Sequence, residues 1–271
     1  MASSKLEALV SRARLVEVRD FWFEHLTGPD DLILFKQEHG KRWFFGGQEL
    51  DRACVERFGP ALEAIRDSGV RSGADMLAVA RPQDPSEWLG LVLLLDQMPR
   101  NCYRGDAAAV AFTIFDPIAR GVALAAMQRG VPDEEPATRW RFAYRQWFYL
   151  PLMHSEDVAT HEVAEQAYER MRRDVSALID GGDAAPDGSA VGGEDRARAA
   201  AVVRANADDA RKLVDMQILF EKKHFDIIKR FGRYPHRNKV LGRTSTPEEV
   251  EYLENGGETF SQPPADAGDK K

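Results

Sequence analysis

The stretch DPSEWLGLVLLLDQMPRN, residues 84–101, decides the fold class of this chain. It opens with a typical helix start, in which Asp84 can accept from the first backbone N–H groups, Pro85 suits the first helical position and Glu87 follows three residues after the cap. Residues 88–95 are apolar on every side of a helical projection. Such a helix has to be surrounded by other elements, so we expect it at the centre of the protein.

Helical periodicity continues on both sides of this central stretch. Pro99 is expected to end the central helix, because proline lacks a backbone N–H. Only a weak hint at 42–45 suggests a strand. Further helices are predicted at 6–23, 51–67, 107–128, 139–152, 154–179, 196–231 (as one helix or a broken pair) and 246–254. The sequence therefore predicts an all-α protein of helix pairs joined by short turns.

The chain of 271 residues is 44% hydrophobic, which is enough for a substantial core. We predict a single helical domain over residues 1–254, with a flexible loop at 180–195 that is rich in Gly, Ala, Asp and Ser, and a disordered tail at 255–271. Cys54 and Cys102 form no CxxC motif, so neither a disulfide framework nor a cysteine zinc site is expected. With no apolar run close to 18 residues, we expect a cytoplasmic protein without a membrane contact.

Charge is distributed unevenly along the chain. The formal net charge is −7, but residues 196–243 carry 13 Lys/Arg and 5 Asp/Glu, a local charge of +8. The overall charge argues against a general nucleic-acid binder, whereas the basic segment favours a small anionic ligand.

The basic segment ends in RFGRYPHRNKVLGR, residues 230–243, which gathers cations around a turn. Arginine can bind a carboxylate or phosphate through two parallel hydrogen bonds, and a histidine beside it can transfer protons near neutral pH. The Pro-(x)-Arg-Asn ending also occurs at residues 96–101, so the two turns are expected to form one polar site. A purely structural interpretation stays open, in which these arginines pair with carboxylates or helix ends. The candidates for substrate binding are Arg100, Asn101, Arg233, Arg237, Asn238 and Arg243, and those for catalysis include Asp96 and His236.

Two further histidines complete the set of candidate residues. His154 and Glu156 follow an aromatic helix, where the structural alternative makes Ser155 a helix cap and places Glu156 in the first turn. His224 falls on the apolar stripe of the helix at 196–231, so it is either a core residue or a substrate-binding one. Neighbouring arginines would repel a metal ion, and neither a P-loop nor a dinucleotide fingerprint is present, so no metal or cofactor is predicted.

These residues lie in blocks that resemble the DUF924 family, a helical domain of unknown function. The blocks run in the same order as in the family over roughly residues 18–254, and they comprise Phe21-Trp22-Phe23, Trp43-Phe44-Phe45, residues 94–101, residues 149–156, and His224 through Arg243 to Glu249. The loop at 180–195 and the tail depart from the family pattern. The resemblance implies a tetratricopeptide-like array of antiparallel helix pairs, and it supports His154 or Glu156 as site residues. It implies no activity, because fold alone does not assign one.

The leading hypothesis is a metal-independent enzyme of small-molecule or amino-acid metabolism, of the hydrolase or acyl/amide-transfer type. Asp96 would orient a partner, His154, Glu156 and His236 would transfer protons, and the arginines would bind an anionic or amino-acid-like substrate. The first alternative is a peptide-binding module without turnover. The second is an aminoacyl-tRNA-dependent transferase that docks RNA on residues 196–243. The oligomeric state is not predicted.

Overall fold

The computed structural model describes residues 2–181 and 193–260, and every regular element within these two ranges is helical. This confirms the all-α fold, whereas the tetratricopeptide-like pairing remains a prediction. The hint of a strand at 42–45 is wrong, because these residues end a helix. In chain order the elements are α1 (Ala2–Leu9), α2 (Arg12–Phe23), α3 (Gln37–Phe45), α4 (Gly47–Asp67), α5 (Gly73–Ala80), α6 (Pro85–Cys102), η1 (Gly105–Ala108), the π-helical η2 (Ala111–Phe115), α7 (Asp116–Gln128), α8 (Pro136–Arg139), α9 (Phe142–Arg145), η3 (Gln146–Phe148), α10 (Leu150–Met153), α11 (Val158–Asp180), α12 (Gly193–Ala205), α13 (Ala207–Phe231), η4 (Pro235–Arg237) and α14 (Pro247–Glu254).

Helix α6 begins as predicted but does not end as predicted. The Asp84 side chain accepts from the backbone N–H of Glu87 at 3.0 Å, which confirms the cap. The helix continues one turn beyond Pro99, so the expectation that this proline ends it is wrong. The Asn101 side chain donates to the carbonyl of Gln97 at 2.9 Å, and this bond supports the last turn where the proline contributes no N–H.

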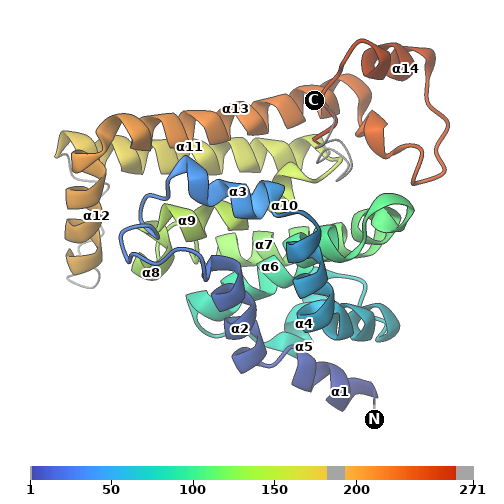
Figure 1. Ribbon diagram of the computed structural model, residues 1–271, viewed down its shortest axis with the longest axis horizontal. Coiled ribbons are helices and arrows are strands. Elements are labelled where there is room, and N and C mark those ends of the chain that lie inside the picture. Colours follow the sequence, from blue (N-terminus) through green and yellow to red (C-terminus); the bar gives the residue numbers. More distant parts are fainter. Residues whose placement is uncertain (1, 182–192, 261–271) are drawn as a thin grey trace.

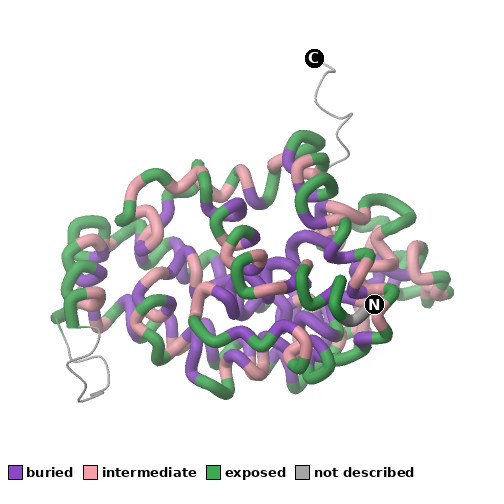
Figure 2. The backbone as a smooth tube through the Cα atoms, turned by 90° about the horizontal axis from the view of Figure 1, so that it is seen from below, coloured by how far each residue is buried: buried purple, intermediate pink, exposed green. Residues whose placement is uncertain are grey.

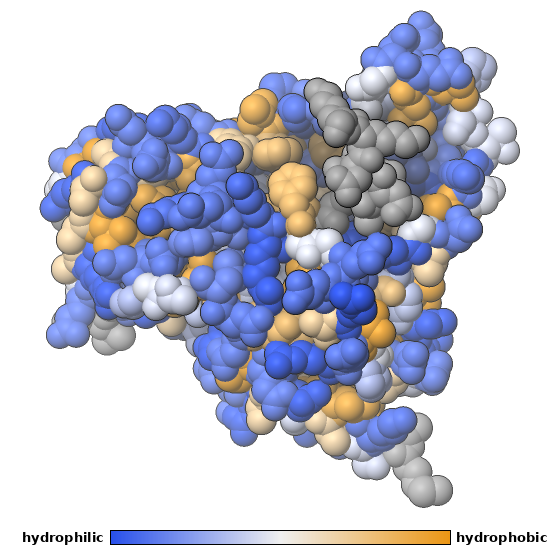
Figure 3. Space-filling view, in the orientation of Figure 1, coloured by the Kyte–Doolittle hydropathy of each residue, from blue (hydrophilic) through white to orange (hydrophobic). Residues whose placement is uncertain are grey.

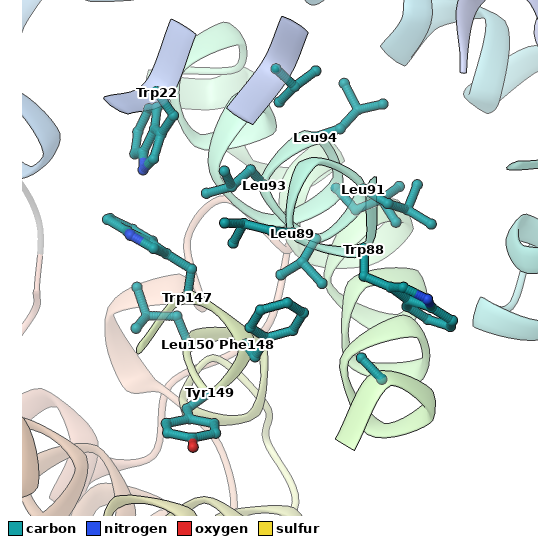
Figure 4. Packing of buried hydrophobic residues seen from close by; sticks show 14 of the residues in the cluster. Trp22, Trp88, Leu89, Leu91, Leu93, Leu94, Trp147, Phe148, Tyr149 and Leu150 are labelled. Carbon is teal, nitrogen blue, oxygen red and sulfur yellow. The ribbon is translucent and has the colours of Figure 1, made fainter. Parts of the chain in front are cut away.

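The central position of α6 is confirmed by its burial. Leu89, Leu91, Leu93 and Leu95 are all completely inaccessible to solvent, and α6 packs against α2, α4 and α7. Figure 4 shows its leucines beside aromatic rings from other elements. Most buried apolar residues form one large cluster that reaches from α1 to α13, and two smaller clusters lie apart from it. Figure 2 shows the buried residues in the interior. This continuous core fits a single domain.

Helix α2 crosses α6 at very close range. The predicted helix at 6–23 is in fact α1 and α2, because Ser11 between them is extended, with ψ 155°. A Cβ atom added to Gly90 of α6 would lie 1.9 Å from the backbone oxygen of Leu15 in α2. The missing side chain at Gly90 therefore permits the two helix backbones to touch.

The predicted helix at 107–128 is a run of three helical segments, η1, η2 and α7. One 18-residue window between Gly105 and Gln128 has a mean hydropathy of 1.5, although Asp116 and Arg120 interrupt its apolar run. Length and composition alone are weak evidence for a membrane span, because core helices pass the same test. In this structure 44% of that window is buried, and α7 packs against α5 and α6.

The predicted helix at 139–152 is broken into α8, α9, η3 and α10. The backbone N–H groups of Phe142 and Ala143 donate to the carbonyls of Ile33 and Leu32, at 3.2 and 3.1 Å. Arg145 in α9 is completely buried and forms ion pairs with two carboxylates from other parts of the chain. These hydrogen bonds and ion pairs with distant residues interrupt a segment whose hydrophobic pattern predicts one continuous helix.

Helices α11 and α13 run side by side in opposite directions along one edge of the molecule (Figure 1). The first begins at Val158 with Asp157 as its cap, where the sequence predicted a start at His154 and a cap at Ser155. The basic segment is a broken pair, α12 and α13, and Gly232 ends α13 in a left-handed conformation. Of the predicted loop at 180–195, both ends are helical and residues 182–192 lie outside the described ranges.

The chain after α14 packs back on α13. Helix α14 is capped by Thr246, whose side chain accepts from the N–H of Glu249. Where the sequence predicted disorder from residue 255, the Phe260 ring stacks on His224 with 3.5 Å between ring centroids. Residues 261–271 lie outside the described ranges. Hydrophilic residues cover most of the face shown in Figure 3, although some large apolar side chains are exposed, among them Phe45 at 70%.

Candidate functional site

A cavity of about 210 Å³ opens where η2 and α7 meet two turns from later in the chain. The first turn follows α10 and carries His154, and the second surrounds and follows η4. Polar and charged side chains predominate in the wall. The lining residues are Phe112, Thr113, Asp116, Pro117, Arg120, His154, Ser155, Glu156, Arg237, Leu241 and Arg243.

His154 is held from behind by a buried carboxylate. Its Nδ1 lies 2.8 Å from Oδ1 of Asp96, which is only 1% exposed. The other oxygen of Asp96 accepts from Nε2 of Gln97 at 2.6 Å, and Nη1 of Arg100 lies 3.5 Å from Oδ1. The predicted role of Asp96, to orient a partner, stays a prediction, and this contact gives it His154 as that partner.

Burial and neighbouring charges set the protonation states of Asp96 and His154. Burial raises the pKa of Asp96, but Arg100 and His154 outweigh it and bring that pKa down to about 2. Burial and then Arg100 lower the pKa of His154 below 6.5, against the opposing effect of Asp96. At neutral pH, Asp96 is therefore ionised and His154 is neutral. Because a carboxylate only accepts, we assign the proton of His154 to Nδ1, which leaves the lone pair on Nε2.

The backbone around His154 is anchored to the C-terminal block. The Tyr234 hydroxyl donates to the carbonyl of Met153 at 2.6 Å, and Nη1 of Arg237 donates to the carbonyl of His154 at 3.1 Å. The carbonyl of Ser155 accepts from Nε2 of the buried His161 at 2.9 Å. Three consecutive carbonyls are thus bound by side chains, which holds the imidazole in place relative to the cavity.

Arg237 lies deep in the wall. It is 6% exposed, and its guanidinium carbon lies 4.4 and 4.5 Å from the ring centroids of Phe112 and Tyr234. It shares the carboxylate of Asp116 with Arg100, at 3.4 and 2.8 Å respectively. Both arginines therefore have carboxylate partners, and the aromatic rings fix the orientation of Arg237.

Glu156 lies at the cavity wall in an ion pair. Arg243 donates to both of its carboxylate oxygens, at 3.0 and 2.8 Å, and the N–H of Tyr234 donates to one of them. Burial raises the pKa of Glu156, but these bonds outweigh it and keep the pKa below 4.5. A carboxylate held in this way is a weak base, so the geometry favours a structural role over the predicted catalytic one.

Arg120 is the lining cation with the fewest partners. Its Nη1 donates to Oγ of Ser155 at 3.1 Å, and no carboxylate of the described residues lies within 4.0 Å of its guanidinium. It is half-buried, and it reaches the cavity from α7.

Other predicted substrate-binding residues do not line the cavity. Arg233 donates to both oxygens of Glu249, at 2.6 and 2.8 Å, and Asn238 donates to the same carboxylate at 3.2 Å. These bonds tie η4 to the start of α14. Asn101 binds a carbonyl of its own helix, and Arg100 lies behind the wall with its carboxylates. The structural interpretation of these arginine and asparagine side chains therefore fits the geometry.

His224 and His236 are also outside the cavity wall. His224 donates from Nδ1 to the carbonyl of Phe220 at 2.8 Å and stacks on Phe260, as its place on the apolar stripe allows. The His236 ring lies 5.5 Å from that of Tyr234. Burial, followed by Arg237, lowers the pKa of His236 to about 4. His236 is thus a neutral ring packed beside aromatic side chains.

Sequence reasoning missed the contribution of η2 and α7. Asp116 and Arg120 are four residues apart, so a helix presents both on one face of an otherwise apolar segment. That pair of opposite charges was the sequence feature that could have indicated a polar site on α7. Phe112, Thr113 and Leu241 carry no comparable signal, because only the tertiary fold brings them to the cavity.

Comparison with known proteins places the chain in a poorly characterised group. A family model described as "Bacterial protein of unknown function (DUF924)" matches residues 18–257. The solved structure of a protein of unknown function, ATU0120 from Agrobacterium tumefaciens, is 30% identical in sequence and covers 90% of this chain and 98% of its own, with a TM-score of 0.55. No curated protein matches.

Proposed function

The chain belongs to the DUF924 family of bacterial proteins of unknown function, and we propose that it is a metal-independent enzyme that hydrolyses or transfers an acyl group of a small anionic substrate. The observation that carries the proposal is the contact between buried Asp96 and His154, whose ring lines a cavity. A neutral imidazole oriented by a carboxylate is a typical general base.

The proposed reaction uses His154 as base and then as acid. Nε2 takes a proton from water, or from the acceptor of the acyl group, as the oxygen of that nucleophile bonds to the acyl carbon. The carbonyl oxygen becomes negative near the guanidinium group of Arg237, which lowers the energy of the intermediate. The bond from the acyl carbon to the leaving nitrogen or oxygen then breaks, and the leaving group takes the proton from Nε2. Asp96 stabilises the transient imidazolium.

The arrangement of charged residues favours a small molecule over a peptide or RNA. The polar groups converge on one cavity of about 210 Å³ and do not spread along an open groove. Most cations of the basic segment are already paired, including Arg198 with Asp30 and Arg230 with Glu248. Lining cations would hold the anionic group of the substrate. Among the described residues, no similar gathering of side chains supports either alternative, the peptide-binding module or the tRNA-dependent transferase.

The proposal is tested by measuring turnover of a panel of p-nitrophenyl esters and p-nitroanilides with short acyl groups that end in a carboxylate. We expect wild-type protein to hydrolyse at least one member, and the His154→Asn variant to be slower by about 10²-fold or more. His39→Asn is the control, because this histidine lies on α3 and does not line the cavity. Equal rates for wild type and His154→Asn, or no hydrolysis of any member by the wild type, would contradict the proposal.

The pH dependence of turnover is a second expectation. His154 acts as a base only when neutral, and burial together with Arg100 lowers its pKa below 6.5. The rate should therefore be constant near pH 7 and fall only as the pH drops through that lowered pKa. The measurement is the pH profile of kcat/KM for an ester that the wild type hydrolyses. An acidic limb centred above pH 6.5 would show that His154 is not the titrating base.

A further inference from the structure

Charge balance in the cavity wall identifies the cation that a ligand can use. Arg243 donates through Nη1 and Nη2 to the carboxylate of Glu156, and Arg237 shares the carboxylate of Asp116 with Arg100. These guanidinium groups are already neutralised by carboxylates.

Arg120 differs from these arginines, because its one hydrogen-bond partner among the described residues is the neutral Ser155 hydroxyl, at 3.1 Å. A hydroxyl carries no charge to pair with the guanidinium, and Asp157 interacts with Arg120 electrostatically from beyond ion-pair distance. Four of the five N–H groups of the guanidinium stay available. Arg120 also reaches the cavity beside the turn that holds His154. An anionic group on this arginine would thus place the rest of a short ligand close to the imidazole.

The sign and size of the uncompensated charge restrict the ligand. The wall holds Arg120, Arg237 and Arg243 against Asp116 and Glu156, a formal excess of one positive charge with His154 neutral. Outside the wall, Asp96 and Arg100 cancel each other, and Asp157 acts on Arg120 from beyond ion-pair distance. One excess charge matches a monoanion. A phosphate dianion would bring a second negative charge close to the carboxylates of Asp116 and Glu156, which already pair with arginines.

Part of the wall is apolar. Phe112, Pro117 and Leu241 line the same cavity as the charged groups. A ligand with one charged end and a short apolar body would cover these side chains, whereas a fully polar ligand would leave them without a partner.

We infer that the cavity binds a small monocarboxylate that carries an ester or amide carbonyl, with its carboxylate on Arg120, its apolar part against Phe112 and Leu241, and its carbonyl carbon beside Nε2 of His154. An N-acyl amino acid has this combination of groups. The position of the carbonyl rests on the proposed function, whereas the pairing of the carboxylate with Arg120 does not. The two parts can therefore fail separately.

The test is a binding measurement by isothermal titration calorimetry with N-acetylalanine, its neutral primary amide and phenyl phosphate. The protein carries His154→Asn, so that binding is measured without turnover. We expect N-acetylalanine to bind at least about 10-fold more tightly than the amide, because an ionised acceptor forms stronger hydrogen bonds with a guanidinium. Phenyl phosphate should bind more weakly than N-acetylalanine. No binding of N-acetylalanine, or tighter binding of phenyl phosphate, would overturn the inference.

Substitution of Arg120 locates the carboxylate. Arg120→Gln, on the same background, should weaken N-acetylalanine binding by about 10-fold or more and leave the binding of the amide unchanged, while Arg120→Lys should retain part of the affinity. Arg211→Gln is the matched control, because it removes the same charge from the far end of α13, where Arg211 pairs with Asp208. Unchanged binding to Arg120→Gln would overturn the inference even if His154 proves to be catalytic. Loss of catalysis alone, with Arg120-dependent binding intact, would contradict only the proposed function.

Discussion

Replacing Gly90 with alanine is expected to lower the free energy of unfolding by about 3 kcal/mol or more. The added Cβ would lie 1.9 Å from the backbone oxygen and 2.6 Å from the carbonyl carbon of Leu15. Backbone atoms cannot rotate away as a side chain can, so α2 and α6 would have to separate. Both helices belong to the main core, and their separation would open voids among fully buried leucines. Chemical denaturation followed by circular dichroism measures the change.

Gly40→Ala is the matched control for this prediction. Gly40 lies inside α3, and a Cβ there would meet only the Phe44 ring, at a distance of 3.8 Å. Alanine loses less backbone entropy than glycine in a helix, so this variant should be more stable than the wild type by up to about 1 kcal/mol. If both variants changed stability by the same amount, the effect at Gly90 would come from helix propensity and not from the contact with α2.

Replacing Asp96 with asparagine is expected to reduce kcat by about 10³- to 10⁴-fold and to leave KM nearly unchanged. Asparagine has the same shape but no charge, so the imidazolium formed during the reaction loses its counter-ion. Its amide must also present an NH₂ group either to Nδ1 of His154 or to Gln97, whose own NH₂ group donates to the carboxylate in the wild type. The first arrangement places the His154 proton on Nε2, where it blocks the base.

Separate readouts distinguish this effect from simple misfolding. The Asp96 carboxylate raises the pKa of His154 against burial and Arg100. Its removal should therefore move the acidic limb of the kcat/KM profile to lower pH, while the thermal unfolding temperature shows that the variant is folded. A rise in KM with kcat unchanged would indicate that Asp96 shapes the substrate site and does not act through His154.

The fold class could be predicted from sequence because its signals are local. The cap at Asp84 and the apolar run that follows it depend on neighbouring residues, and both are confirmed. The cap of α14 at Thr246 and the left-handed Gly232 at the end of α13 also depend on neighbouring residues. Helix ends that depend on distant groups were predicted less well. The segment at 139–152 is interrupted because backbone groups of α9 bond to a loop more than a hundred residues earlier.

Only part of the candidate site could be predicted from the sequence, because most of its contacts join residues that are far apart in the chain. The sequence predicted that Asp96 would orient a partner, and in the structure its carboxylate contacts His154. Closeness in the sequence was a poor guide to which side chains share the cavity. Arg233 and Asn238 share the turn of Arg237 but face Glu249, because a short helical turn such as η4 directs successive side chains to different sides.

Arg120 illustrates what sequence alone could not supply. A single arginine in an apolar helix resembles any surface cation, and only its missing carboxylate partner distinguishes it. That property depends on the positions of residues from η2, α7, the turn after α10 and η4 together. Charge balance in a cavity is a tertiary property, and no local pattern records it.

The state of the His154 imidazole tests the central claim most directly. A ¹H–¹⁵N correlation spectrum of the side-chain nitrogens, assigned by comparison with His154→Asn, reports which nitrogen carries the proton. We predict a neutral ring at pH 7 with the proton on Nδ1 and a titration below pH 6.5, in accordance with its burial against Asp96. Addition of N-acetylalanine should shift the Nε2 resonance. A proton on Nε2, or a doubly protonated ring at pH 7, would contradict the assignment of His154 as the base.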